Sequence, residues 1–157
     1  MDIRDAFFSE LYKIARDDKD VILLTADMGA KKLDDFRKLP NQFFNMGVAE
    51  QNMINVATGL ALSGKKVFCY AIAAFLVRRC LDQIKVNLVD MNLPVALIGV
   101  NPGNHYWWDG PTHCVEHDEE IMRAIGVKVI YNFTRGTQPI FTWDCLTYVR
   151  LCAGQTK

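Results

Sequence analysis

Val21-Ile22-Leu23-Leu24-Thr25 is a short, nearly all-apolar run that is rich in strand-forming residues. Such a run is typical of a strand covered on both faces, as strands of a parallel sheet are. Residues 2–17, which precede it, carry apolar side chains at helical spacing and charged side chains on the opposite face, so they are expected to form an amphipathic helix. A helix followed by a buried strand indicates an α/β protein.

The same alternation continues along the rest of the chain. Further strands are expected at residues 43–46, 66–71, 95–100, 127–131 and 147–151, and helices at residues 50–63, 74–90 and 119–125. This order predicts a three-layer α/β fold with a mostly parallel, six-stranded sheet and helices on both faces. Because no repeat, low-complexity stretch or linker interrupts it, residues 1–157 are expected to form a single domain.

The composition excludes several classes of protein. Half of the 157 residues are hydrophobic, and 18 Lys and Arg balance 18 Asp and Glu, as in an ordinary globular domain. Scattered basic residues and zero net charge argue against a nucleic-acid partner. The apolar runs are too short to cross a bilayer and the N-terminus does not resemble a signal peptide, so no membrane partner and a cytoplasmic location are expected. The five cysteines, odd in number and without C-x-x-C spacing, are expected to be free thiols.

Three loops are expected to carry the chemistry, because ligands of such sheets gather after the carboxyl ends of the strands. They cover residues 26–30, 71–75 and 101–117, and the length of the last indicates a functional loop. Its histidines match no common zinc spacing, so no metal site is predicted. His113 and Asp109 either bind hydroxyls of a polar substrate, shielded from water by Trp107 or Trp108, or are surface residues.

Glu50 lies where the expected strand 43–46 turns into an otherwise apolar helix. One interpretation is a first-turn acid favoured by the helix dipole. The other is a buried carboxyl that holds or exchanges a proton with a ligand nitrogen. Phe75 is similarly either a core residue or a cofactor contact, and Arg78 and Arg79 face either a ligand or solvent. The chain contains none of the glycine-rich motifs that cradle a diphosphate.

Three stretches of the sequence resemble the pyrimidine-binding domain of the transketolase family of thiamine diphosphate enzymes. They are LLTADMG at residues 23–29, FFNMGVAEQNM at 43–53 and DGPTH at 109–113. The resemblance covers nearly the whole chain in the right order of elements, and it also includes Phe75-Leu76, Arg79 and Asp82-Gln83-Ile84.

This resemblance implies roles for individual residues. Glu50 would hydrogen-bond a ring nitrogen of the cofactor's aminopyrimidine and so promote loss of the proton from the thiazolium carbon. Phe75 would line the pocket of the pyrimidine ring, and Asp27 would lie near the thiazolium. In full, the expected catalytic residues are Glu50 and His113, the expected cofactor contacts are Asp27, Glu50, Phe75 and Arg79, and the expected substrate contacts are Asp109 and His113.

The resemblance also implies a partner. In the family the cofactor lies between this domain and a diphosphate-binding domain that holds Mg²⁺, and a third, C-terminal domain normally follows. Neither is expected in this chain, which therefore resembles a stand-alone subunit. The leading hypothesis is a split transketolase-like transferase, in which this subunit forms a homodimer within an α2β2 assembly and a two-carbon ketol unit passes between sugars or sugar phosphates.

Other interpretations stay open. Lys31, Lys32 and Arg135 either replace the phosphate contacts of the family or face solvent. The chain could instead be a subunit of a 2-oxo acid decarboxylase or of an acyloin-forming enzyme. It could also be a non-catalytic subunit that assembles or regulates another protein.

Overall fold

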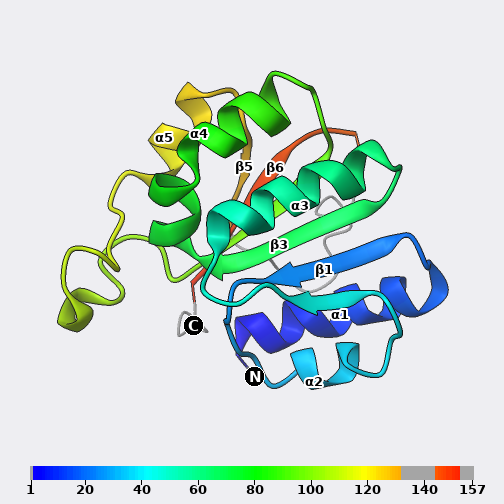
Figure 1. Ribbon diagram of the computed structural model, residues 1–157. Helices are drawn as coiled ribbons and strands as arrows, with labels where there is room; N and C mark the ends of the chain where they lie inside the picture. The colour runs from blue at the N-terminus through cyan, green and yellow to red at the C-terminus, as the bar shows by residue number, and fades with distance from the viewer. Residues whose placement is uncertain (1, 132–143, 153–157) are drawn as a thin grey trace.

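A single six-stranded sheet forms the centre of the computed structural model, which describes residues 2–131 and 144–152 (Figure 1). The strands lie in the order β2-β1-β3-β4-β6-β5, and every neighbouring pair is parallel. This confirms the predicted α/β fold and its six strands. Their bounds are Val21–Thr25 for β1, Phe43–Asn45 for β2, Lys66–Ile72 for β3, Val95–Val100 for β4, Lys128–Ile130 for β5 and Thr147–Leu151 for β6.

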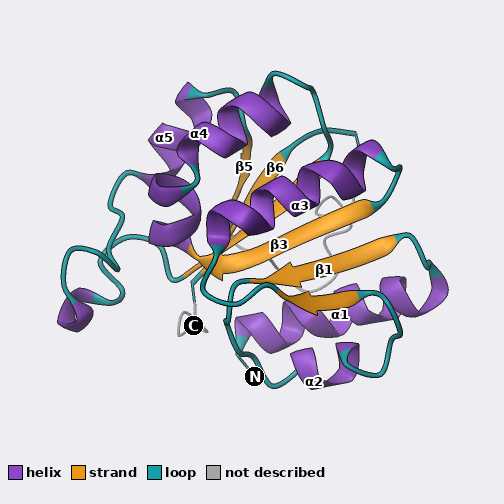
Figure 2. Ribbon diagram, viewed as in Figure 1, coloured by secondary structure: helices purple, strands orange, loops and turns teal. Residues whose placement is uncertain are grey.

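Helices cover both faces of the sheet (Figure 2). The described α-helices are α1 (Ile3–Asp17), α2 (Leu33–Phe36), α3 (Glu50–Leu62), α4 (Leu81–Gln83) and α5 (Asp118–Ala124). Helices α1 and α2 pack on one face through an aromatic cluster in which Phe8 lies edge-on to Tyr70 of β3, with ring centroids 4.8 Å apart. Helices α3, α4 and α5 lie over the other face. Each face thus has its own apolar core.

The helix expected at residues 74–90 has a less regular form. It consists of a π-helix η1 (Phe75–Arg79), the short α4, and a second π-helix η2 (Ile84–Val89). A π-turn closes its hydrogen bond five residues along the chain instead of four, and such turns are frequent at functional sites. Apolar spacing predicts a helix here without revealing the wider turn, because the buried side chains still lie on one face.

The strand order brings two of the expected functional loops together. Strand β2, which follows β1 along the chain, lies on one side of β1, and β3 lies on the other side. The strand order therefore reverses between β1 and β3. Ligands of doubly wound sheets bind at such a switch point, outside the carboxyl ends of the strands. The loops after β1 and β3 therefore flank this position, and the long loop after β4 projects from the same edge (Figure 1).

The structure also describes the cysteines and the lengths of the apolar helices. All five cysteines are free, and Cys69 and Cys80 are buried in the core. Burial raises the pKa of the Cys80 thiol to about 12, which suits a packing role. Within the ranges that the structure describes, no helix is long and apolar enough to span a membrane.

Candidate functional site

Glu50 begins α3, and its side chain is almost wholly enclosed, with 2% exposed. The strand β2 ends at Asn45, and Gly47 turns the chain with a φ of +70°, a backbone conformation that glycine adopts readily. The turn directs the first residue of α3 inward beside the core. Glu50 is thus both an acid in the first turn of α3 and a buried carboxyl, and its proton exchange with a ligand stays a prediction.

Arg79, at the end of η1, compensates the charge of this carboxylate. Its Nη1 donates to Oε2 of Glu50 at 2.6 Å, and its guanidinium stands 4.1 Å from the centroid of the Phe75 ring. In the described part of the chain the hydrogen bond from Arg79 reaches Oε2, and Oε1 is not among the fully enclosed side-chain atoms without a partner, so it stays accessible from outside. An enclosed carboxylate with one oxygen held and one acceptor left over is suited to receive a hydrogen bond from a ligand.

Phe75 and His113 continue this group of side chains toward the long loop. Their ring centroids are 4.8 Å apart in an edge-to-face arrangement, and Nδ1 of His113 lies 3.0 Å from the Thr112 hydroxyl. A cavity of about 500 Å³ opens between η1 and the loop and is lined by Phe75, Arg79 and Thr112 among others. Glu50, Arg79, Phe75 and His113 thus form one continuous set of contacts.

Asp27 lies at the same edge of the sheet, at the end of β1, and is exposed. Its backbone N–H donates to Oδ1 of Asn45 at 3.0 Å, and Nδ2 of Asn45 donates back to Oδ1 of Asp27 at 3.1 Å. The same Asn45 oxygen accepts from the N–H of Gly47. One side-chain amide, not singled out in the sequence, therefore joins the loop after β1 to the turn that leads to Glu50.

The loop at residues 101–117 is more ordered than a connection without regular structure. Gly103 and Val115 form an antiparallel bridge with N···O distances of 2.8 and 3.0 Å, and a 3-10 helix, η3, covers Trp107–Asp109. Asp109 is exposed at the end of η3, and its contact within the described residues is a backbone hydrogen bond to Tyr106. Asp109 thus shares the loop with His113 without joining the set of contacts around Glu50.

The candidate phosphate contacts do not assemble in the described residues. Lys31 is exposed, and Nζ of Lys32 lies 3.3 Å from Asp35 in an ion pair. Arg135 lies outside the described residues. In the described part of the chain, no group of three or more His, Cys, Asp or Glu is arranged to hold a metal ion.

Asp118 is a buried acid that sequence reasoning missed. It begins α5 with no exposed surface, and its Oδ2 accepts from the Tyr148 hydroxyl at 2.9 Å. Arg150 binds both of its oxygens, with Nε at 2.7 Å and Nη2 at 2.9 Å. These bonds fasten the far end of the long loop to β6. In the sequence the only signal is an acid at the start of an expected helix, which does not distinguish it from an exposed first-turn residue.

Comparison with known proteins places this chain in a protein family. The family model described as the transketolase pyrimidine-binding domain matches residues 1–135, so the chain belongs to that family.

Individual relatives agree with the family. A subunit of the apulose-4-phosphate transketolase of Phocaeicola vulgatus is 41% identical over 130 residues, which are 81% of this chain and 42% of the relative. The 6-deoxy-6-sulfo-D-fructose transketolase subunit SqwH of Clostridium sp. (strain MSTE9) is 34% identical over 157 residues, which are 95% of this chain and 49% of the relative. The solved structure of a split gene transketolase, an inactive beta4 tetramer, superposes with a TM-score of 0.82 at 25% identity, covering 97% of this chain and 52% of that chain. The chain spans about half the length of the relatives it matches.

Proposed function

We propose that this chain supplies the pyrimidine-binding half of a thiamine diphosphate site in a split transketolase-type enzyme, which transfers a two-carbon ketol unit between sugars. The observation that carries the proposal is Glu50: a carboxylate enclosed at a helix start and held on one oxygen by Arg79, which together with Phe75 lines a cavity. Membership of the family, and two relatives that are named as transketolase subunits, support it.

The residues present fit the pyrimidine end of thiamine diphosphate. A planar ring with nitrogen donors and acceptors needs an aromatic wall and an enclosed polar partner. Phe75 lines the cavity, and Glu50 lies next to it through its hydrogen bond with Arg79, which also lines it. When bound, the cofactor supplies a carbon nucleophile and an electron sink for cleaving the bond next to a carbonyl group.

The side chains of this chain would bind, orient and move a proton. Oε1 of Glu50 would hold the proton that is shared with a ring nitrogen, and Arg79 keeps the carboxylate in position through Oε2. Phe75 would pack against the ring, and Asp27 would border the cofactor from the loop after β1. His113 and Asp109, on the long loop, would bind hydroxyls of the sugar. We assign catalytic roles to Glu50 and His113 on this basis.

The partner in this proposal is a chain that carries the diphosphate-binding domain and holds Mg²⁺. The naming of two relatives as subunits, and the tetrameric transketolase of a split gene, support such a division. We propose an α2β2 assembly in the cytoplasm. Because the named relatives act on ketoses, apulose 4-phosphate and 6-deoxy-6-sulfo-D-fructose, a ketose is proposed as the donor substrate.

The test is ketol transfer from a panel of ketoses, free and phosphorylated, by this chain with the diphosphate-binding subunit recovered by pull-down, thiamine diphosphate and Mg²⁺. Glu50→Ala is expected to abolish turnover without breaking assembly, whereas Glu120→Ala, at an exposed acid on α5, is expected to leave it unchanged. An assembled Glu50→Ala complex that stays active would overturn the mechanism. Release of CO₂ from a 2-oxo acid would favour the decarboxylase or acyloin-forming alternative, and absence of cofactor binding the non-catalytic one.

A further inference from the structure

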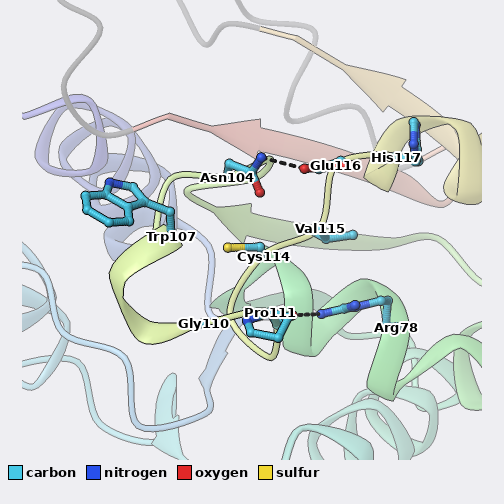
Figure 3. Close-up of a pocket in the computed structure, with 9 residues that line it drawn as sticks. All are labelled: Arg78, Asn104, Trp107, Gly110, Pro111, Cys114, Val115, Glu116 and His117. Atoms are coloured by element: carbon cyan, nitrogen blue, oxygen red, sulfur yellow. Dashed lines mark hydrogen bonds between the residues drawn. The ribbon is translucent and has the colours of Figure 1, made fainter.

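Arg78 and Arg79 are adjacent in η1, and their side chains reach two different parts of the candidate site. Neighbouring residues of a helical segment do not face each other, so the two side chains diverge. Arg79 binds Glu50 of α3, and its backbone carbonyl accepts from Nε2 of Gln51 at 3.0 Å, which fastens the end of η1 to α3. Arg78 reaches the long loop instead, where its Nη2 donates to the Pro111 carbonyl at 2.7 Å (Figure 3).

The part of the loop that Arg78 binds is a tight turn that ends at His113. The N–H of His113 donates to the carbonyl of Gly110 at 3.1 Å, which is the hydrogen bond of a β-turn. That bond uses the first carbonyl of the turn and leaves those of Pro111 and Thr112 to accept from other groups. Nη2 of Arg78 donates to both, at 2.7 and 3.4 Å. Arg78 therefore binds the turn through its backbone.

The position of this turn decides where the His113 imidazole lies. The imidazole packs edge-to-face against Phe75 of η1, with ring centroids 4.8 Å apart. The segment η1 thus contacts the turn twice, through this aromatic pair and through the hydrogen bonds of Arg78. Hydrogen bonds from a charged donor are stronger than neutral ones. The bridge between Gly103 and Val115 fastens the base of the loop, and η1 holds the turn within it.

The hydrogen bonds of Arg78 also join the two walls of the cavity of about 500 Å³ beside Phe75. Arg78 lines this cavity from η1, and Pro111 and Thr112 line it from the loop. The bonds therefore set how far apart the two walls stand. Because a misplacement of about 1 Å can cost about 10²-fold in rate, a side chain that exchanges no proton can still control the reaction.

We propose that Arg78 is a positioning residue of the ketol transfer, which holds the turn of the long loop so that His113 stays packed against Phe75. The inference rests on the proposed function and deepens it. It makes the position of the loop that carries the proposed substrate contacts, relative to the cavity for the pyrimidine ring, depend on one side chain.

The first test is the NMR spectrum of the His113 ring, measured on the chain. The chain has three histidines, and the signals of His113 are those that disappear in His113→Gln. The neighbouring Phe75 ring shifts these signals, and Phe75→Leu gives their position without it. Arg78→Met removes the donor and is expected to move the signals toward that position. Because one nitrogen of Arg78 makes both contacts, Arg78→Lys, with a single charged donor, is expected to keep them near the wild-type position.

The second test is the steady-state kinetics of the assembled complex with a ketose donor. Arg78→Met is expected to lower kcat/KM for the ketose about 10–100-fold, and Arg78→Lys is expected to stay within about threefold of the wild type. The matched control is Arg37→Met, at an exposed arginine that pairs with Asp34, and it is expected to change neither the His113 signals nor kcat/KM. Because Arg78 is also exposed, its replacement is not expected to unfold the chain.

Three outcomes separate the possibilities. If the His113 signals stay in place in Arg78→Met, the proposal is overturned, and a loss of kcat/KM without such movement assigns Arg78 to a direct ligand contact. If the signals move while kcat/KM is unchanged, the positioning role in the reaction is refuted. The NMR measurement needs no turnover, so failure of the proposed function is recognised separately: the signals then respond to Arg78 as expected, while the wild-type complex transfers no ketol unit.

Discussion

Among the residues that the structure describes, two carboxylates are almost wholly buried, and they differ in how many of their oxygens are hydrogen-bonded. Glu50 and Asp118 each begin a helix at a loop-to-helix junction. Both oxygens of Asp118 are hydrogen-bonded, by Arg150 and by the Tyr148 hydroxyl. Glu50 has a partner on one oxygen only, and that partner, Arg79, is itself 41% exposed.

The difference separates a carboxylate with both oxygens hydrogen-bonded within the chain from one with a partner on one oxygen. Removing a charge from water costs several kcal/mol, and the interior recovers this cost only when the remaining lone pairs are satisfied. Asp118 meets that condition within the chain. Glu50 meets it in part, which is the expected state of a group whose last hydrogen bond comes from a bound molecule.

The largest expected effect is on activity, at Glu50. Glu50→Gln keeps the shape and removes the proton-exchanging carboxylate, so kcat of the assembled enzyme is expected to fall by about 10²–10⁴-fold. The free energy of unfolding is expected to change by less than about 1 kcal/mol, because Arg79 is left partly in water and not enclosed. Steady-state kinetics and urea unfolding measure the two quantities. A loss of stability that accounts for the loss of activity would remove the distinction between the two carboxylates.

The second prediction concerns stability, at Asp118. Asp118→Asn is expected to lower the free energy of unfolding by about 3 kcal/mol, because Arg150 loses its charged partner inside the fold. Urea unfolding with an unchanged m-value is the measurement. An Asp118→Asn chain as stable as the wild type would show that this network does not hold β6 to α5.

The third prediction concerns the Tyr148 ring, whose hydroxyl donates a hydrogen bond to Asp118. A Cβ added at Gly99 would lie 2.5 Å from the Tyr148 hydroxyl oxygen, closer than real contacts allow. Gly99→Ala is expected to destabilise the chain by about 2 kcal/mol. The cost is expected to be smaller in the Asp118→Asn background, where the ring is free to shift, and a double-mutant cycle measures the coupling. If the destabilisations by Gly99→Ala and Asp118→Asn were strictly additive, this would contradict the view that Asp118 holds the ring in place.

The smallest expected effect is at Asp18, a carboxylate that is partly open to solvent. The hydrogen bond from Lys66, at 2.6 Å, is the main cause that lowers the pKa of Asp18 below its usual value of 3.8. A lowered folded-state pKa adds stability that is present above pH 3.8 and is lost as the pH falls through the folded value. Asp18→Asn is therefore expected to cost about 0.5 kcal/mol at pH 7 and nothing at the acid end. Urea unfolding across pH 2–7 follows it, and a difference that grows toward low pH would contradict the sign.

Much of the fold was predictable, because apolar runs mark buried strands directly. The bounds of β1, β4 and β6 agree with the sequence expectation, whereas β2 and β5 are shorter than expected by one residue and by two. Helix α2 was not predicted, because its four residues, two of them acidic, are too few to show a period. The π-turns of η1 and η2 are set by packing and leave no mark in the apolar pattern.

The sequence predicted single residues of the candidate site but not the contacts between them. The motif around Glu50 singles it out, but the contact with Arg79 joins residues 29 positions apart and follows from the crossing of η1 over α3, not from any local pattern. Asn45 and Asp118 escaped notice for the same reason, since their partners lie 18 and 30 or more positions away. The roles assigned to the site residues all stay predictions: Glu50, His113, Asp27, Phe75, Arg79 and Asp109.

The bridge between Gly103 and Val115 brings the two ends of a long excursion within hydrogen-bond distance of each other. A closed base of this kind isolates residues 104–114 from the sheet, because their length and composition can change without moving β4 or α5. Residues 104–114 can therefore be exchanged as a unit. With Asp109 and His113 in their proposed roles, grafting the corresponding segment of a relative onto this base is expected to change substrate choice and to leave the Glu50–Arg79 pair in place.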